Sequence, residues 1–129
     1  MKKVDTKGRW KLYVPIYHIE TELYIGEGSI PSTMEIETDG MDGNTQVLER
    51  DGNSKVVIWL RKMDWTSTDI GLLTHELLHA VNKIFYLIGI EDPCDEEISC
   101  YLLQYLVTNY SRKINKKSKL LKEGENEGR

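Results

Sequence analysis

The segment from Thr66 to Gly89 constrains the fold more than any other part of the chain, because it carries two different stripes at helical spacing. Residues three or four apart lie on one face of an α-helix. The apolar stripe is expected to face a core, and it comprises Ile70, Leu73, Leu77, Val81, Ile84 and Ile88. The polar stripe comprises His75, His79, Asn82 and Tyr86. A helix with two such faces is predicted to line a cleft.

The sequence marks both the start and the end of this helix. Thr66 is expected to be the N-cap, and Asp69, three residues later, completes a pattern like a capping box. Gly89 can end the helix through a left-handed cap, since glycine adopts that conformation without a steric penalty.

Within the helix lies the sequence His75-Glu76-Leu77-Leu78-His79, an HExxH motif. Two imidazoles one helical turn apart point the same way and can supply two of the four ligands of a tetrahedral zinc ion. Glu76 lies beside them, where a carboxylate can take a proton from metal-bound water. The simpler alternative is an ordinary amphipathic helix with two surface histidines, but this alternative does not explain the presence of Glu76.

The residues from Leu72 to Val81 contain no proline, and Glu76 is their only charged residue. With the motif, this pattern resembles the zincin metallopeptidases. The resemblance implies one Zn²⁺ ion as cofactor, with His75 and His79 as ligands and Glu76 as the catalytic general base. It also implies a minimal zincin-like domain of the α+β class. In such a domain a small N-terminal antiparallel or mixed sheet precedes the motif helix, and a C-terminal helix carries the third ligand.

The third ligand is sought among the acids that open a second predicted helix, in Glu91-Asp92-Pro93-Cys94-Asp95-Glu96-Glu97. Proline and acidic residues are both favoured in a first helical turn. The spacing of Ile98, Leu102 and Leu106 lets this helix pack antiparallel to the first, which brings its start near the motif. The acids are also explained by the helix dipole alone, and their positions by themselves do not choose among them.

A further resemblance ranks these acids. In the gluzincins a glutamate on the helix after the motif is the third ligand, and the segment from Glu97 to Leu102 resembles the Glu-small-x-x-aromatic pattern of compact intracellular and phage-type zincins. This implies Glu97 as the third ligand, with Glu96 as the alternative and Asp95 after it. For the donor that stabilises the oxyanion we consider Tyr101, Tyr105, Tyr86 and His18, and Asn82 is expected to orient a ligand.

Before the motif the chain is predicted to be β. Residues 10–17 form a strand that Pro15 confines to a sheet edge, and residues 22–26 form another. The segment 28–44 is expected to be a loop with a short strand near Met34. Strands 45–50 and 55–60 flank Asp51-Gly52-Asn53-Ser54 as a hairpin. In zincins an edge strand above the metal binds the substrate, which implies that strand 55–60 or its partner binds a peptide.

Composition limits the remaining possibilities. The chain has a net charge of −4. Its length of 129 residues fits a single domain, placed here at residues 1–110. A charged tail, 111–129, is expected to be flexible, and its basic run, 112–122, is the only segment suited to touching nucleic acid. No stretch resembles a signal peptide or a membrane span, so we expect a cytoplasmic protein.

The expected function is therefore zinc-dependent hydrolysis of a peptide bond, with a narrow range of protein substrates. One alternative is a zincin-fold binding module, such as a phage or mobile-element protein that engages a host factor, with metal but little or no proteolysis. The other is an interaction protein without metal.

Overall fold

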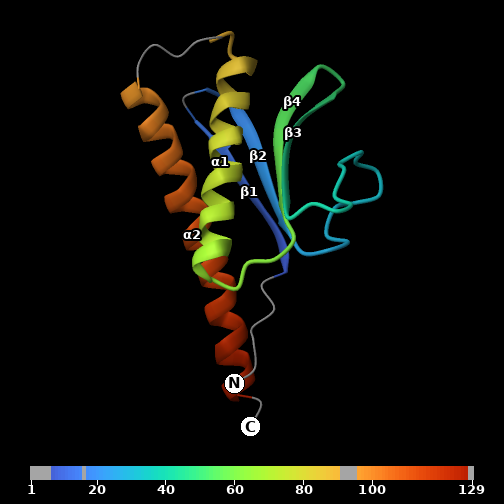
Figure 1. Ribbon diagram of the computed structural model, residues 1–129, viewed down its shortest axis with the longest axis vertical. Coiled ribbons are helices and arrows are strands. Elements are labelled where there is room, and N and C mark those ends of the chain that lie inside the picture. The colour runs from blue at the N-terminus through green and yellow to red at the C-terminus, as the bar shows by residue number, and fades with distance from the viewer. Residues whose placement is uncertain (1–6, 16, 91–95, 128–129) are drawn as a thin grey trace.

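The computed structural model describes residues 7–15, 17–90 and 96–127, with side chains described as far as residue 116. The elements are β1 (Gly8–Val14), β2 (Ile19–Ile25), β3 (Gly43–Arg50), β4 (Asn53–Leu60), α1 (Ser67–Leu87) and α2 (Glu96–Glu127). A four-stranded mixed sheet lies against two helices (Figure 1). The prediction of an α+β domain is thus confirmed.

The strand order is β1-β2-β4-β3, with β2 parallel to β4 and the outer pairs antiparallel. β1 is an edge strand and ends at Val14, directly before Pro15, as the proline predicts. The sequence left open whether strand 55–60 or its partner forms the edge, and the structure excludes 55–60, because β4 is paired on both sides. Its residues Val56–Leu60 are buried on both faces of the sheet, which is typical of an inner strand. The edge is its partner, β3.

The turn between β3 and β4 is tighter than expected. Asp51 and Gly52 both have positive φ, 55° and 80°, which makes a two-residue turn of the type that suits the twist of a hairpin. Asn53 and Ser54 therefore belong to β4. No strand forms near Met34; instead, apolar residues of the 26–42 loop pack against the sheet face opposite the helices. They are Ile30, Met34, Ile36 and Met41, which contact Tyr24, Val57 and Trp59.

The ends of α1 follow the sequence closely. The Thr66 hydroxyl accepts from the Asp69 N–H at 3.1 Å, but the Asp69 carboxylate accepts from the Asp64 N–H at 2.8 Å, so the expected capping box is not reciprocal. Asp69 thereby occupies an inward position, and Ile70, predicted to be buried, is exposed. At the other end Gly89 has a φ of 85°, and Ile90 donates to the Phe85 carbonyl at 2.8 Å.

α2 packs against α1 and β1 and runs antiparallel to α1 (Figure 1). Every fourth residue of its inner face is buried: Leu102, Leu106, Tyr110 and Ile114. The packed core therefore extends past residue 110, where we placed the end of the domain, because Ile114 continues this stripe among basic residues. Whether residues beyond it are flexible stays a prediction. In the described part of the chain, no helix combines the length and the apolarity that crossing a membrane requires.

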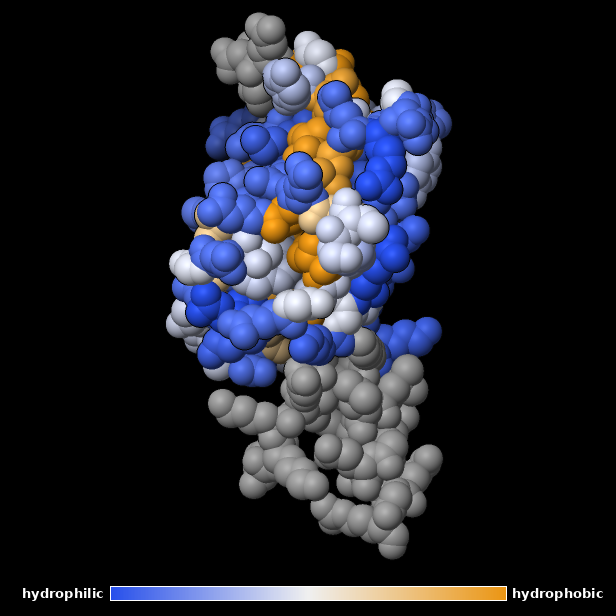
Figure 2. Space-filling model, turned by 90° about the vertical axis from the view of Figure 1, so that its right-hand side faces the viewer, coloured by the Kyte–Doolittle hydropathy of each residue, from blue (hydrophilic) through white to orange (hydrophobic). Residues whose placement is uncertain are grey.

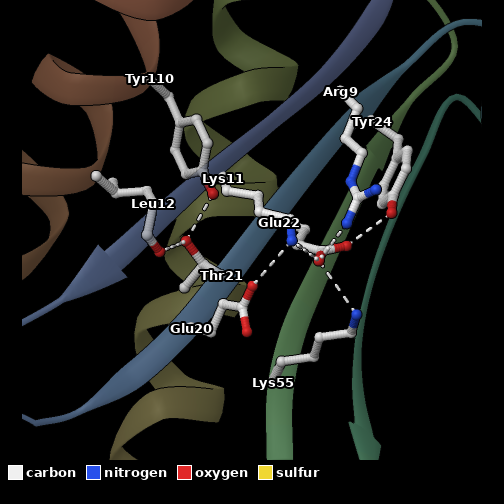
Figure 3. Close-up of polar contacts among 9 residues, drawn as sticks. All are labelled: Arg9, Lys11, Leu12, Glu20, Thr21, Glu22, Tyr24, Lys55 and Tyr110. Carbon is white, nitrogen blue, oxygen red and sulfur yellow. Dashed lines mark hydrogen bonds and ion pairs between the residues drawn. The ribbon is translucent and has the colours of Figure 1, made fainter.

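Two polar networks flank β2 (Figure 3). On the face away from the helices, the Glu22 carboxylate accepts from Arg9 at 2.8 Å, from Lys55 at 3.1 Å and from the Tyr24 hydroxyl at 2.6 Å. Burial acts to raise the pKa of Glu22. The hydrogen bonds from Tyr24, Arg9 and Lys55 outweigh burial and hold that pKa below its ordinary value. Burial and the bond to Glu22 raise the pKa of Tyr24 to about 12.

On the other face, Thr21 joins the sheet to α2. Its hydroxyl donates to the Leu12 carbonyl at 2.8 Å and lies 2.6 Å from the Tyr110 hydroxyl. Because the Thr21 proton is used toward Leu12, Tyr110 is the donor to Thr21. Burial raises the pKa of Tyr110, so the phenol stays protonated and this chain of bonds persists at neutral pH.

Candidate functional site

The two motif histidines converge on one point. The Nε2 atoms of His75 and His79 are 3.2 Å apart, with ring centroids 4.8 Å apart and ring planes at 80°. Both residues are exposed, and the side chain of His75 retains 64% of its accessible surface. One helical turn thus presents two nitrogens to solvent side by side.

This separation fits a shared metal ion. Zinc–nitrogen bonds of about 2.05 Å at a tetrahedral angle place two ligand nitrogens about 3.3 Å apart. The observed Nε2–Nε2 distance is 3.2 Å. The same distance suits an N–H···N hydrogen bond between one protonated and one unprotonated ring nitrogen. The separation of the two nitrogens is therefore compatible with a shared metal ion and with a direct hydrogen bond.

The acids predicted as third ligands are not grouped with the two histidines among the described side chains. Glu96 and Glu97 lie exposed in the first turn of α2, and Asp95 is outside the described residues. α1 contacts β3 and β4, whereas α2 contacts β1, so the two helices cover different halves of the sheet. Among the described side chains, no group of three His, Cys, Asp or Glu residues is close enough to hold a metal. The third ligand thus stays a prediction.

Glu76, in contrast, lies beside His75. It is 5% exposed and lies between α1 and β3. Its Oε1 accepts from the Thr45 hydroxyl at 2.7 Å, and the same hydroxyl is 3.1 Å from the main-chain carbonyl oxygen of Glu76. Its Oε2 lies 4.0 Å from His75 Nε2. One carboxylate oxygen is thus held by the edge strand and the other lies near His75.

β3 also leaves room for this carboxylate. A Cβ atom at Gly43 would lie 3.0 Å from Cγ, 3.1 Å from Oε2 and 3.2 Å from Cδ of Glu76. Those distances are too short for an undisturbed contact, so any side chain at residue 43 would displace Glu76. Sequence reasoning missed both Gly43 and Thr45. The available signal was a polar threonine at an inward position of a strand, two residues after a glycine.

An open groove of about 730 Å³ runs between β3 and α1 beside His79. Its lining comprises Glu35, Asn44, Thr45, Gln46, Val47, Leu48, His79, Asn82, Lys83 and Tyr86. Three residues of the predicted polar stripe are among them, which confirms that this helix lines a cleft. Figure 2 views the molecule from the side of β3 and β4, and hydrophobic residues run along its long axis between hydrophilic surfaces.

The outer edge of β3 presents unpaired backbone groups to this side. The Arg61 N–H donates to the Asp42 carbonyl at 2.9 Å, which sets the alternation of bonds along the hairpin. With that alternation Gly43, Thr45 and Val47 direct their N–H and C=O groups away from β4. No backbone hydrogen bond from another segment within the described ranges reaches them. The edge is therefore available to an added strand.

The residues considered as oxyanion donors or as groups that orient a ligand lie in different places. Asn82 and Tyr86 line the groove with His79. The Tyr105 hydroxyl donates to the Tyr13 carbonyl at 3.4 Å, and His18 Nδ1 lies 2.6 Å from the Tyr13 hydroxyl. Both contacts lie at β1, the opposite edge of the sheet. Tyr101 is exposed on α2 and is not among the groove residues.

Comparisons with protein-family models, with curated proteins and with solved structures found no match for this chain. The resemblance to zincins therefore depends on the motif and its immediate surroundings alone.

Proposed function

We propose that the chain is a zinc-dependent peptidase that hydrolyses a peptide bond in an extended segment of a protein substrate. The observation that carries this proposal is the convergence of two exposed imidazole nitrogens, His75 Nε2 and His79 Nε2, at 3.2 Å beside the carboxylate of Glu76. A pair of surface histidines alone needs no buried carboxylate beside it. A metal site that only stabilises the fold needs no general base.

The substrate chemistry follows from the edge of β3. A peptide in extended conformation can pair with the outward N–H and C=O groups of Thr45 and Val47 as an added strand. It would then lie over the groove that His79, Asn82 and Tyr86 line. Main-chain pairing supplies affinity for many sequences, and the groove side chains supply the selection among them.

The residues would act as follows. His75, His79 and an acid of α2, Glu97 in our proposal, would hold one zinc ion. Bound zinc supplies a Lewis acid that acidifies water and polarises a carbonyl group. Glu76 takes a proton from the attacking water and delivers it to the leaving amine, the usual sequence for a general base that becomes an acid. Asn82 or Tyr86, which line the same groove, would donate a hydrogen bond to the developing oxyanion.

Metal binding is tested first, with untagged protein freed of metal and titrated with Zn²⁺. We expect one ion per chain, and stabilisation of about 2.7 kcal/mol at a zinc concentration of 100 times the Kd. His75→Asn and His79→Asn should abolish the effect, while His18→Asn, the matched control at the other sheet edge, should preserve it. Glu97→Gln should weaken binding more than Glu96→Gln. Absence of any zinc-dependent stabilisation of the wild type would refute the proposal.

Activity is tested with a library of synthetic peptides and with whole protein extracts, analysed by mass spectrometry. Glu76→Gln should lose cleavage while still binding zinc. Glu20→Gln, a carboxylate remote from the groove, should cleave like the wild type. If the wild type binds zinc but neither it nor Glu76→Gln cleaves anything, the zincin-fold binding module replaces the peptidase as the conclusion.

A further inference from the structure

The two oxygens of the Glu76 carboxylate have different surroundings. Oε1 accepts the Thr45 hydroxyl at 2.7 Å, whereas Oε2 lies 4.0 Å from His75 Nε2. A general base works only when one of its lone pairs faces the proton that it takes. The Thr45 bond engages Oε1 and leaves Oε2, the oxygen recorded near His75, for proton transfer.

Gly43 restricts the same carboxylate from another side. Its missing Cβ would lie 3.1 Å from Oε2, so the backbone of β3 sits close against that oxygen. A glutamate has three rotatable bonds before its carboxylate, and an unrestrained one samples many orientations. The edge strand thus fixes both where the Glu76 carboxylate lies and how it is turned.

We propose that Thr45 is a positioning residue for Glu76, and that through it β3 aligns the base with the substrate. This inference rests on the proposed peptidase function. The main chain of Thr45 points to the free edge, where the substrate would pair, while its side chain points inward to Glu76. One residue would therefore contact both the base and the substrate. The placement of the scissile bond and the orientation of the base are set by the same strand.

A purely structural role for Thr45 makes a different prediction. Its hydroxyl also lies 3.1 Å from the Glu76 carbonyl oxygen, so it could simply fasten β3 to α1. Fastening alone affects stability and leaves turnover unchanged once the protein is folded. Positioning of the base affects kcat, and it spares KM because the backbone that pairs with substrate is unaltered.

The first test is kinetic and uses a synthetic peptide that the wild type cleaves. Thr45→Val keeps the shape and removes the hydroxyl, and kcat should fall about tenfold to a hundredfold, as for a misplaced catalytic group. KM should stay within about threefold of the wild-type value. Thr45→Ser restores the hydroxyl and should restore kcat. Thr21→Val is the matched control, since Thr21 is also a buried strand threonine with a bonded hydroxyl, remote from the groove.

The second test needs no activity and no metal. Unfolding by urea is measured for metal-free wild type, Thr45→Val, Glu76→Met and the double variant. If the hydroxyl holds the charged carboxylate, the two substitutions should be coupled by about tenfold or more in the unfolding equilibrium constant. Additive effects would overturn the proposal. Should Thr45→Val not fold, Thr45→Ala supplies the kinetic comparison, because it removes the hydroxyl and leaves a smaller side chain.

The outcomes separate the two proposals. If Glu76→Gln cleaves the peptide as fast as the wild type, the peptidase mechanism fails. If Glu76→Gln is inactive but Thr45→Val keeps its kcat, the positioning role fails and the peptidase mechanism stands. A fall in kcat that Thr45→Ser does not reverse also overturns the positioning role, since the hydroxyl is then not responsible.

Discussion

Replacing Glu22 with glutamine tests the polar network that ties three strands together on the outer face of the sheet. Its carboxylate is 1% exposed and is bonded to Arg9 of β1 and Lys55 of β4. Removing one partner from a fully buried ion pair costs about 3–5 kcal/mol. Arg9 and Lys55 remain 45% and 27% exposed, so water can partly replace the lost charge. We therefore expect Glu22→Gln to cost about 2–3 kcal/mol at neutral pH.

The pKa of Glu22 determines how the cost of Glu22→Gln changes with pH. The pKa of Glu22 is lower in the folded protein than its ordinary value of 4.5. Such a group contributes stability that is fully present above the unfolded pKa and is lost as the pH falls through the folded pKa. The difference between wild type and Glu22→Gln should thus be constant from pH 7 to pH 5. This difference in the free energy of unfolding should become smaller below the unfolded pKa.

Urea unfolding followed by circular dichroism at several pH values measures this difference. Glu20→Gln is the matched control, because Glu20 is 43% exposed and, among the described residues, forms an ion pair only with Lys11, at 3.6 Å. An exposed pair of this kind contributes at most about 1 kcal/mol. If Glu22→Gln costs no more than Glu20→Gln, or if its cost is the same at pH 3 as at pH 7, the reasoning is wrong.

Three further predictions concern the stability of the fold around the site, and urea unfolding measures each of them. Ile114→Ala should cost about 2–4 kcal/mol, since this side chain is fully buried; a cost near zero would return the domain boundary to residue 110. Tyr110→Phe should cost about 1 kcal/mol by removing the bond to Thr21, and no loss would mean that the bond contributes nothing. Gly52→Ala should destabilise by about 1–2 kcal/mol because its φ is 80°. Gly71→Ala, at an exposed position of α1, should stabilise by about 0.5–1 kcal/mol, and equal signs for the two changes would contradict the backbone argument.

The features that could be predicted from the sequence are those set by residues close together in the chain. The spacing of His75 and His79 fixes a shared helix face, and Thr66 and Gly89 fix the helix ends. A run of apolar residues between turn signals likewise identified β4. Each of these depends on contacts within one helix or one hairpin, where spacing and geometry are directly related.

The features that were missed depend on pairing between distant segments. That β4 pairs with β2, and so lies inside the sheet, joins residues more than thirty positions apart. The contact of Thr45 with Glu76 likewise joins β3 to α1. The alternation of β3 shows that Thr45 faces inward, but only the packing of α1 on that face shows which residue it meets. A local pattern thus identifies the base, and the tertiary fold identifies what holds it.

The third ligand belongs to this second class, and zinc itself should reveal it. The first turn of α2 has exposed side chains at Glu96, Glu97 and Ile98, and its first buried residue is Leu102. Within the described residues this turn buries little apolar surface, so rearranging it costs little compared with the free energy that metal binding can contribute to folding. We therefore predict that zinc increases the hydrogen-exchange protection of amides in this turn, because Glu97 is drawn to the ion. Glu97→Gln should abolish the increase without altering protection in α1 around His75. Equal protection with and without zinc in the wild type would mean that the third ligand lies elsewhere in the chain.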